Sequence, residues 1–271
     1  MILRTCRHYI LCFVPISLLL QQNAENLYRN NFNKHRKWGM YVKIAGLQKL
    51  TLLDYPGKTA CTVFTWGCNL RCPFCHNAGL VTEPLTEAIT ADELYAFLKK
   101  RIGLLDGVCV TGGEPLLQPD LFEFLKPIRD MGFAVKLDTN GTNPDRLREI
   151  TESGLIDTVA MDIKNSPEKY AVTAGTERIS IDAVHRSVRY LMQQTKISYE
   201  FRTTVVKQYH TAEDFEKIGE WIRGADAYYL QNFRNSGQLI DNSTTGFTPS
   251  EMRHFLEIVR KYVPNAELRG V

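Results

Sequence analysis

The sequence lacks a fourth cysteine near its densest group of cysteines. Cys68, Cys72 and Cys75 lie within eight residues, and the other four of the seven cysteines are scattered. Structural zinc sites are closed by four ligands, commonly as two separated pairs, and no second pair follows here. His76 is a poor fourth ligand because it directly follows Cys75. Three neighbouring cysteines also cannot all pair with one another, so the sequence argues against structural zinc and against a disulfide framework.

The sequence also lacks an apolar run long enough to span a membrane. The run at residues 9–20 is shorter than the roughly 20 residues of a spanning helix, and Pro15 interrupts it. Basic residues precede this run as in a signal peptide, but no small-residue cleavage pattern follows it. We therefore expect residues 1–39 to be a non-native or disordered extension and the functional, cytoplasmic protein to begin at Met40. A membrane-surface anchor is the alternative.

Outside this N-terminal segment, basic residues do not outnumber acidic ones. Residues 1–39 hold six of the 33 Lys and Arg and one of the 30 Asp and Glu, which leaves 27 basic and 29 acidic residues in the rest. Nucleic-acid-binding domains carry basic patches or stripes. We therefore expect no nucleic-acid partner for residues 40–271.

What the sequence does contain is a loop suited to an iron–sulfur cluster. A cubane cluster held by three thiolates leaves one iron without a protein ligand, and a cofactor or substrate can coordinate there. The motif Cys-x-x-x-Cys-x-aromatic-Cys, with Phe74 as the aromatic residue, resembles the signature of radical S-adenosylmethionine (SAM) enzymes. Residues 51–58 and 66–72 resemble the anaerobic ribonucleoside-triphosphate reductase activating proteins and the pyruvate formate-lyase activating enzymes.

The segments after Lys58 alternate in type. Short runs rich in β-branched and aromatic residues alternate with longer amphipathic segments, as in βα units around a parallel sheet. The expected strands are residues 59–65, 108–111, 134–138, 158–163, 199–206 and 227–231. The expected helices are residues 91–101, 119–131, 144–153, 181–194, 212–223 and 249–262. These six units predict an α/β fold, and the resemblance implies a partial (β/α)6 TIM-type barrel with the radical SAM fold over residues 40–271.

Unusual residues follow five of the six expected strands. The cysteine loop follows the first, and residues 111–115, 137–141, 161–165 and 230–233 close the second, third, fourth and sixth. In parallel barrels the reactive groups collect at the C-terminal ends of the strands. The sequence therefore predicts one shared site at this end of the barrel.

Glycines and carboxylates at these strand ends suggest binding roles. Gly112 and Gly113 would let the backbone approach a ligand closely, and Glu114 could accept from a protonated amino group. Asp138 could accept from ribose hydroxyls. An ordinary turn is the alternative at both places. The resemblance implies that Gly112, Gly113 and Glu114 bind the methionyl amino group of SAM.

Charged residues are expected on the fourth and fifth strands. Asp162 and Lys164 are separated by one residue and therefore share a face of a strand, as a functional or a purely structural ion pair. The resemblance implies that they are catalytic residues beside SAM and the substrate peptide. Arg202 could pair with the SAM carboxylate and Gln231 could contact the nucleoside. By resemblance, the backbone beside Phe74 would lie near the adenine.

By resemblance, Cys68, Cys72 and Cys75 bind a [4Fe-4S] cluster that SAM chelates. Reductive cleavage of SAM would then abstract hydrogen from a glycine of a partner glycyl-radical enzyme, with a flavodoxin- or ferredoxin-type electron donor. The residues leave two alternatives open. One is a radical SAM enzyme with a small-molecule substrate, such as a 7-carboxy-7-deazaguanine synthase. The other is a non-catalytic electron carrier, which would have no use for the polar strand ends.

Overall fold

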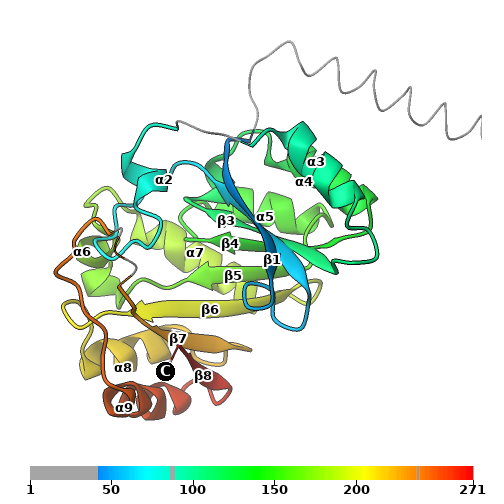
Figure 1. The fold of residues 1–271 in the computed structure, drawn as a ribbon. Coiled ribbons are helices and arrows are strands. Elements are labelled where there is room, and N and C mark those ends of the chain that lie inside the picture. Colours follow the sequence, from blue (N-terminus) through cyan, green and yellow to red (C-terminus); the bar gives the residue numbers. More distant parts are fainter. Residues whose placement is uncertain (1–41, 86–88, 236, 238, 271) are drawn as a thin grey trace, which may run out of the picture. The chain divides into compact units, whose positions relative to one another are not determined.

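The strands of the protein form one sheet in chain order. The computed structural model describes residues 42–85, 89–235, 237 and 239–270. The first strand, β1, is antiparallel to β2, and all later neighbours are parallel (Figure 1). The strands are β1 (Ile44–Thr51), β2 (Ala60–Thr65), β3 (Gly107–Gly112), β4 (Ala134–Thr139), β5 (Thr158–Asp162), β6 (Ser198–Val205), β7 (Tyr228–Asn232) and β8 (Ala266–Arg269).

The central strands are continuous apolar runs because they are buried on both faces. In β3, Val108, Cys109 and Val110 are fully buried, and Cys61 in β2 is buried in the same way. Parallel sheets are covered on both sides and therefore favour such runs over strict alternation. Cys61 and Cys109 are thus core residues with free thiols.

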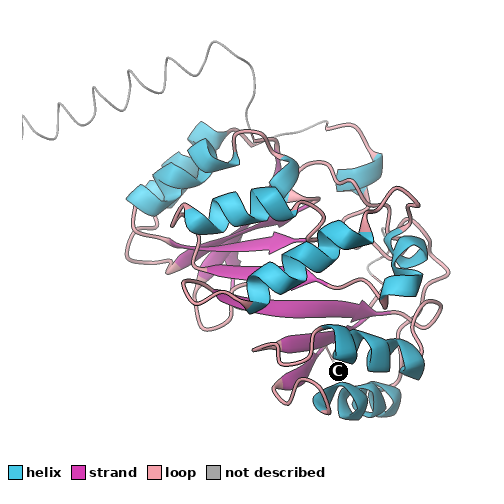
Figure 2. Ribbon diagram, turned by 180° about the vertical axis from the view of Figure 1, so that it is seen from behind, coloured by secondary structure: helices cyan, strands magenta, loops and turns pink. Residues whose placement is uncertain are grey.

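Helices cover one face of this sheet (Figure 2). In α7 the buried residues include Val184, Val188 and Leu191, which recur at helical spacing and face inward. The helices are α2 (Gly79–Thr82), α3 (Ala91–Lys99), α4 (Leu121–Asp130), α5 (Pro144–Glu152), α6 (Tyr170–Ala174), α7 (Ile181–Met192), α8 (Ala212–Trp221) and α9 (Pro249–Arg260), with 3-10 turns at Pro115–Leu117 and Pro167–Lys169.

The predicted partial barrel is confirmed. All six expected strands and all six expected helices are present, with ends that differ by at most two residues. Capping boxes begin α3 at Thr90, α8 at Thr211 and α9 at Thr248. Among the described residues, β1 pairs only with β2 and β8 only with β7, so the barrel is open.

Strands β1 and β8 were not predicted from the sequence. The middle of β1 is largely exposed and gives no clean alternation, and β8 is only four residues long with two charged side chains. Side-chain contacts fix strand β8 to the sheet. Arg269 donates two 2.9 Å hydrogen bonds to the carboxylate of Glu200 on β6. Its guanidinium also lies 3.3 Å from the centre of the Tyr229 ring.

The described residues belong to a compact unit that spans Tyr41–Val271. The expectations for residues 1–39 and for a start at Met40 lie outside the described residues and stay predictions. No helix in the described part of the chain has the length and apolar character needed to cross a membrane.

Candidate active site

A cavity of about 360 Å³ brings the predicted residues together from strands far apart in the sequence. It lies at the C-terminal ends of the parallel strands, where side chains from successive strands converge. The predicted residues that line it are Cys68, Cys72, Phe74, Cys75, Gly112, Gly113, Asp138, Asp162, Lys164, Arg202 and Gln231. Of the predicted set, only Glu114 is not part of this lining.

The cysteine loop is fixed by backbone hydrogen bonds to four distant segments. These bonds use backbone atoms only, and Cys68, Cys72 and Cys75 of this loop line the cavity. The bonds are Gly67 N–H to Leu80 O (2.9 Å), Glu114 N–H to Gly67 O (2.8 Å), Arg71 N–H to Ala174 O (3.0 Å) and Asp241 N–H to Pro73 O (2.8 Å).

Two predicted glycines pack closely against the end of β2 and the cysteine loop that follows it. A Cβ on Gly113 would lie 1.9 Å from the carbonyl oxygen of Gly67, and one on Gly112 would lie 2.3 Å from the backbone nitrogen of Thr65. The predicted close approach of the backbone therefore exists, but Gly112 approaches the end of β2 and Gly113 approaches the cysteine loop. Gly175, which the sequence analysis did not single out, packs in the same way, since its Cβ would lie 1.9 Å from the Arg71 carbonyl oxygen.

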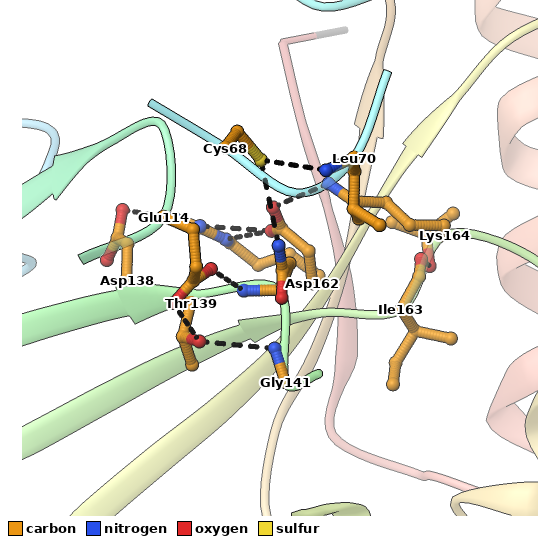
Figure 3. A network of polar contacts seen from close by, with 12 residues as sticks. Cys68, Leu70, Glu114, Asp138, Thr139, Gly141, Asp162, Ile163 and Lys164 are labelled. Atoms are coloured by element: carbon orange, nitrogen blue, oxygen red, sulfur yellow. Dashed lines mark hydrogen bonds and ion pairs between the residues drawn. The ribbon is translucent and has the colours of Figure 1, made fainter. Parts of the chain in front are cut away.

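Glu114 is buried behind the cavity and joins the ends of β3 and β4 (Figure 3). One of its carboxylate oxygens accepts from the Thr139 hydroxyl at 2.7 Å and from the Leu116 N–H at 3.1 Å. The other accepts from the Asn140 N–H at 2.7 Å. Burial raises the pKa of Glu114 to about 7, even though these three hydrogen bonds lower it. Its assignment to the amino group of SAM stays a prediction.

A chain of alternating charges crosses the floor of the cavity. Arg202 lies between two carboxylates, with guanidinium nitrogens 3.0 Å from Asp138 and 3.0 Å from Asp162. The other oxygen of Asp162 accepts from Lys164 at 2.9 Å, and the other oxygen of Asp138 pairs with the buried Lys136. Burial alone would raise the pKa of Asp162, but Lys164 and Arg202 outweigh it and bring the value to about 2. Asp162 is therefore ionised at neutral pH.

These contacts correct the turn alternative for Asp138. Both of its oxygens bind cations, so it does not make an Asx turn. Asn140 makes that turn, because its Oδ1 accepts from the Thr142 N–H at 3.0 Å.

The three cysteines fit a cluster better than a single metal ion. Among the described residues, no three His, Cys, Asp or Glu side chains converge on one ion. A cluster suits three separated thiols because each thiolate binds a different iron. Burial raises the pKa of Cys68 to about 11 and also raises that of Cys72, where Lys164 opposes the shift. Binding must therefore release protons from these thiols.

His76 lines the cavity but is engaged elsewhere. Its ring stacks on Phe233 with centroids 5.2 Å apart, and its Nε2 donates to the Arg234 carbonyl at 2.8 Å. The prediction that His76 is not a fourth ligand stays a prediction.

Some lining residues were missed in the sequence analysis. Gln48 comes from β1, Asp54 from the turn after it and Thr62 from β2. Thr204 comes from β6. The Thr62 hydroxyl donates to Asp54 at 2.5 Å and so directs it toward the cavity. Asp54 lies in the stretch that carries the family resemblance, which was the available signal, whereas Gln48 lies on an unpredicted strand.

Comparison with known proteins decides the family. The family model described as the radical SAM superfamily matches residues 62–222, which is more than half of the chain. The chain belongs to the radical SAM superfamily. It is therefore a radical SAM enzyme, and SAM and an iron–sulfur cluster are the cofactors that this membership implies.

Relatives within the superfamily carry activating-enzyme names. A Methanocaldococcus jannaschii protein named as a candidate glycyl-radical enzyme activating enzyme is 30% identical over 86% of this chain and 98% of its own length. The pyruvate formate-lyase-activating enzyme of Clostridium pasteurianum is 27% identical over 72% of this chain and 83% of its own.

Solved radical SAM structures share the fold. A radical SAM methyltransferase from Sphaerobacter thermophilus superposes with a TM-score of 0.64 and 16% identity over 79% of this chain and 67% of its own. QueE from Escherichia coli superposes with a TM-score of 0.51 and 16% identity over 84% of this chain and 93% of its own.

Proposed function

We propose that this radical SAM enzyme is an activase that abstracts hydrogen from a glycine of a partner glycyl-radical enzyme. The observation that carries the proposal is the cavity itself, where Cys68, Cys72 and Cys75 are the only cysteines of the described residues in the lining and share it with the charged ends of the strands. The activating-enzyme names of relatives that match most of the chain support the partner. The catalytic domain is residues 40–271, and the electron donor is a flavodoxin- or ferredoxin-type protein.

In this proposal Cys68, Cys72 and Cys75 hold a [4Fe-4S] cluster whose open iron binds SAM. When bound, these cofactors supply one-electron cleavage of SAM and the radical that takes the hydrogen atom. The protein orients SAM and excludes water and oxygen from the reacting atoms.

Residues at the strand ends hold the remaining parts of SAM. The backbone at Gly112 and Gly113 binds the amino group, with Glu114 behind it joining the ends of β3 and β4. Arg202 binds the carboxylate through donors that its two aspartate partners leave free. The groups that bind the nucleoside are Asp138 at the ribose, Gln231, and the backbone beside Phe74 at the adenine.

Asp162 and Lys164 face the substrate. Their ion pair lies in the cavity at 2.9 Å and keeps a fixed dipole beside the place where the glycine would enter. An ionised Asp162 and a charged Lys164 hold polar groups of a peptide without donating a proton to the radical reaction.

The first test is reductive cleavage of SAM. Anaerobically reconstituted protein, reduced with dithionite, should convert SAM to 5′-deoxyadenosine, and Cys72→Ala should abolish this. Cys61→Ala is the matched control, because Cys61 is a buried core cysteine outside the cavity and its loss should leave cleavage intact. A cluster that forms without cleaving SAM would contradict the enzymatic assignment.

A second test separates the activase from a small-molecule enzyme. Mixed with SAM, reductant and a glycyl-radical enzyme of its own organism, the protein should generate a stable glycyl radical visible by electron paramagnetic resonance. Multiple turnovers of a small molecule without any partner would refute the activase and favour the 7-carboxy-7-deazaguanine synthase-like alternative.

A further inference from the structure

Asn140 is buried beside the first cysteine of the proposed cluster site. Its Nδ2 lies 3.8 Å from the sulfur of Cys68 and 2.9 Å from the Oδ1 of Asn69. The residue is 5% exposed and forms part of the cavity lining. It belongs to the segment 137–141, which closes the third of the strands expected from the sequence.

The orientation of the Asn140 amide is fixed by an unambiguous donor. Its Oδ1 accepts from the backbone N–H of Thr142 at 3.0 Å and from the Thr142 hydroxyl at 2.6 Å. A backbone N–H can only donate, so the oxygen must face Thr142 and the NH2 group must face Cys68. The NH2 group has two hydrogens, which suffice for Asn69 and for the sulfur.

The position of Asn140 is fixed through its backbone as well. Its N–H donates to the buried carboxylate of Glu114 at 2.7 Å, which ties it to the loop after β3. The sulfur of Cys68 meets a second donor, the Leu70 N–H at 3.4 Å (Figure 3). Cys68 therefore lies between a backbone donor of its own loop and a side-chain donor from the end of β4.

We propose that Asn140 is a positioning residue that donates a hydrogen bond to the Cys68 thiolate and raises the reduction potential of the cluster. The inference rests on the proposed function, since it requires a cluster on Cys68. A metal-bound thiolate is an anionic acceptor, and an N–H dipole aimed at it stabilises the more negative, reduced cluster more than the oxidised one. The electron comes from the external donor, and the cluster passes from the 2+ to the 1+ state.

The test is a potentiometric titration of the reconstituted full-length chain, followed by electron paramagnetic resonance of the reduced cluster. Asn140→Ala removes the donor and should make the potential more negative. We expect the equilibrium constant for reduction to fall about tenfold, which is about 59 mV for a one-electron couple. Asn140→Ser keeps an acceptor for the Thr142 N–H and is too short to reach the sulfur, so it should give the same shift if the alanine variant folds poorly.

Thr142→Val is the matched control. It removes the hydroxyl that bonds Asn140 and accepts from Asn69 at 2.8 Å, but it keeps the backbone N–H that orients the amide. Its potential should match that of the wild type. Equal shifts in the valine and Asn140 variants, or no shift in either Asn140 variant at equal iron content, would overturn the proposal. Failure of the wild type to bind any [4Fe-4S] cluster would instead refute the proposed function and this inference with it.

Discussion

At the scale of single residues, Arg202 forms ion pairs with two carboxylates of the site. It separates Asp138 and Asp162, and its own side chain is 14% exposed. Without the guanidinium, the buried carboxylate of Asp138 and the half-buried carboxylate of Asp162 would face each other with only Lys136 and Lys164 as counter-charges. Removing one partner of a buried ion pair typically costs about 3–5 kcal/mol. We expect Arg202→Met to lower the free energy of unfolding of the cluster-free protein by about 3 kcal/mol or more, measured by urea denaturation.

The surface offers a matched control for this substitution. Arg186 also bridges two carboxylates, at 3.3 Å from Asp145 and 3.5 Å from Asp182, but all three side chains are exposed. Exposed ion pairs contribute about 1 kcal/mol or less because water screens them. Arg186→Met should therefore change the free energy of unfolding by less than about 1 kcal/mol. Equal losses in the two variants would show that the interior chain of charges contributes no special stability.

Glu114 should give the stability a recognisable pH dependence. Burial raises its pKa from 4.5 to about 7 in the folded protein, so the folded state binds more protons than the unfolded state between these values. Stability from this group is therefore present at low pH and is lost as pH rises from 4.5 to 7. Relative to Glu114→Gln, the free energy of unfolding of the cluster-free wild type should fall by at most about 3 kcal/mol over this range. A difference between the two proteins that is constant with pH would contradict this.

At the scale of elements, Gly175 couples the end of α6 to the cysteine loop. It has a φ of 65° and no room for a Cβ against the Arg71 carbonyl, whereas Gly154 after α5 has a φ of 73° and open space around it. Gly154→Ala should cost about 1 kcal/mol from backbone strain alone. Gly175→Ala should cost about 2 kcal/mol more, because the loop must shift. Urea denaturation measures both, and iron content after reconstitution should fall only in the Gly175 variant.

Elements with strong local signals could be predicted, and those defined by their neighbours could not. Helix α9 has periodic apolar residues and a capping box at Thr248, and β3 is a continuous apolar run between turns. Strand β8 has neither and exists because β7 offers backbone partners and Glu200 binds Arg269. Tertiary context of this kind is not encoded in any short window of sequence.

The same distinction holds within the site. The rule that polar strand ends converge in a parallel barrel gathered residues as distant as Cys68 and Gln231. The contact of Gly113 with the cysteine loop and that of Asn140 with Cys68 depend on how two loops pack together. The sequence could show that these residues were unusual but not which atoms they would meet.

At the scale of the whole molecule, the compact unit from Tyr41 onward should be sufficient for stability and catalysis. A chain that starts at Met40 should have the same thermal midpoint and the same rate of 5′-deoxyadenosine formation as the full chain. A lower midpoint or a lost cluster would show that residues 1–39 contribute to the native protein.

The four backbone hydrogen bonds that hold the cysteine loop also imply that the chain folds before the cluster is assembled. Their partners lie near Leu80, Glu114, Ala174 and Asp241, so the loop reaches its final shape only after most of the chain has been synthesised and folded. Loops closed by distant partners form late in folding because the chain entropy must be overcome first. Biogenesis should therefore deliver iron and sulfide to a completed barrel, and the nascent cysteines must stay reduced until then.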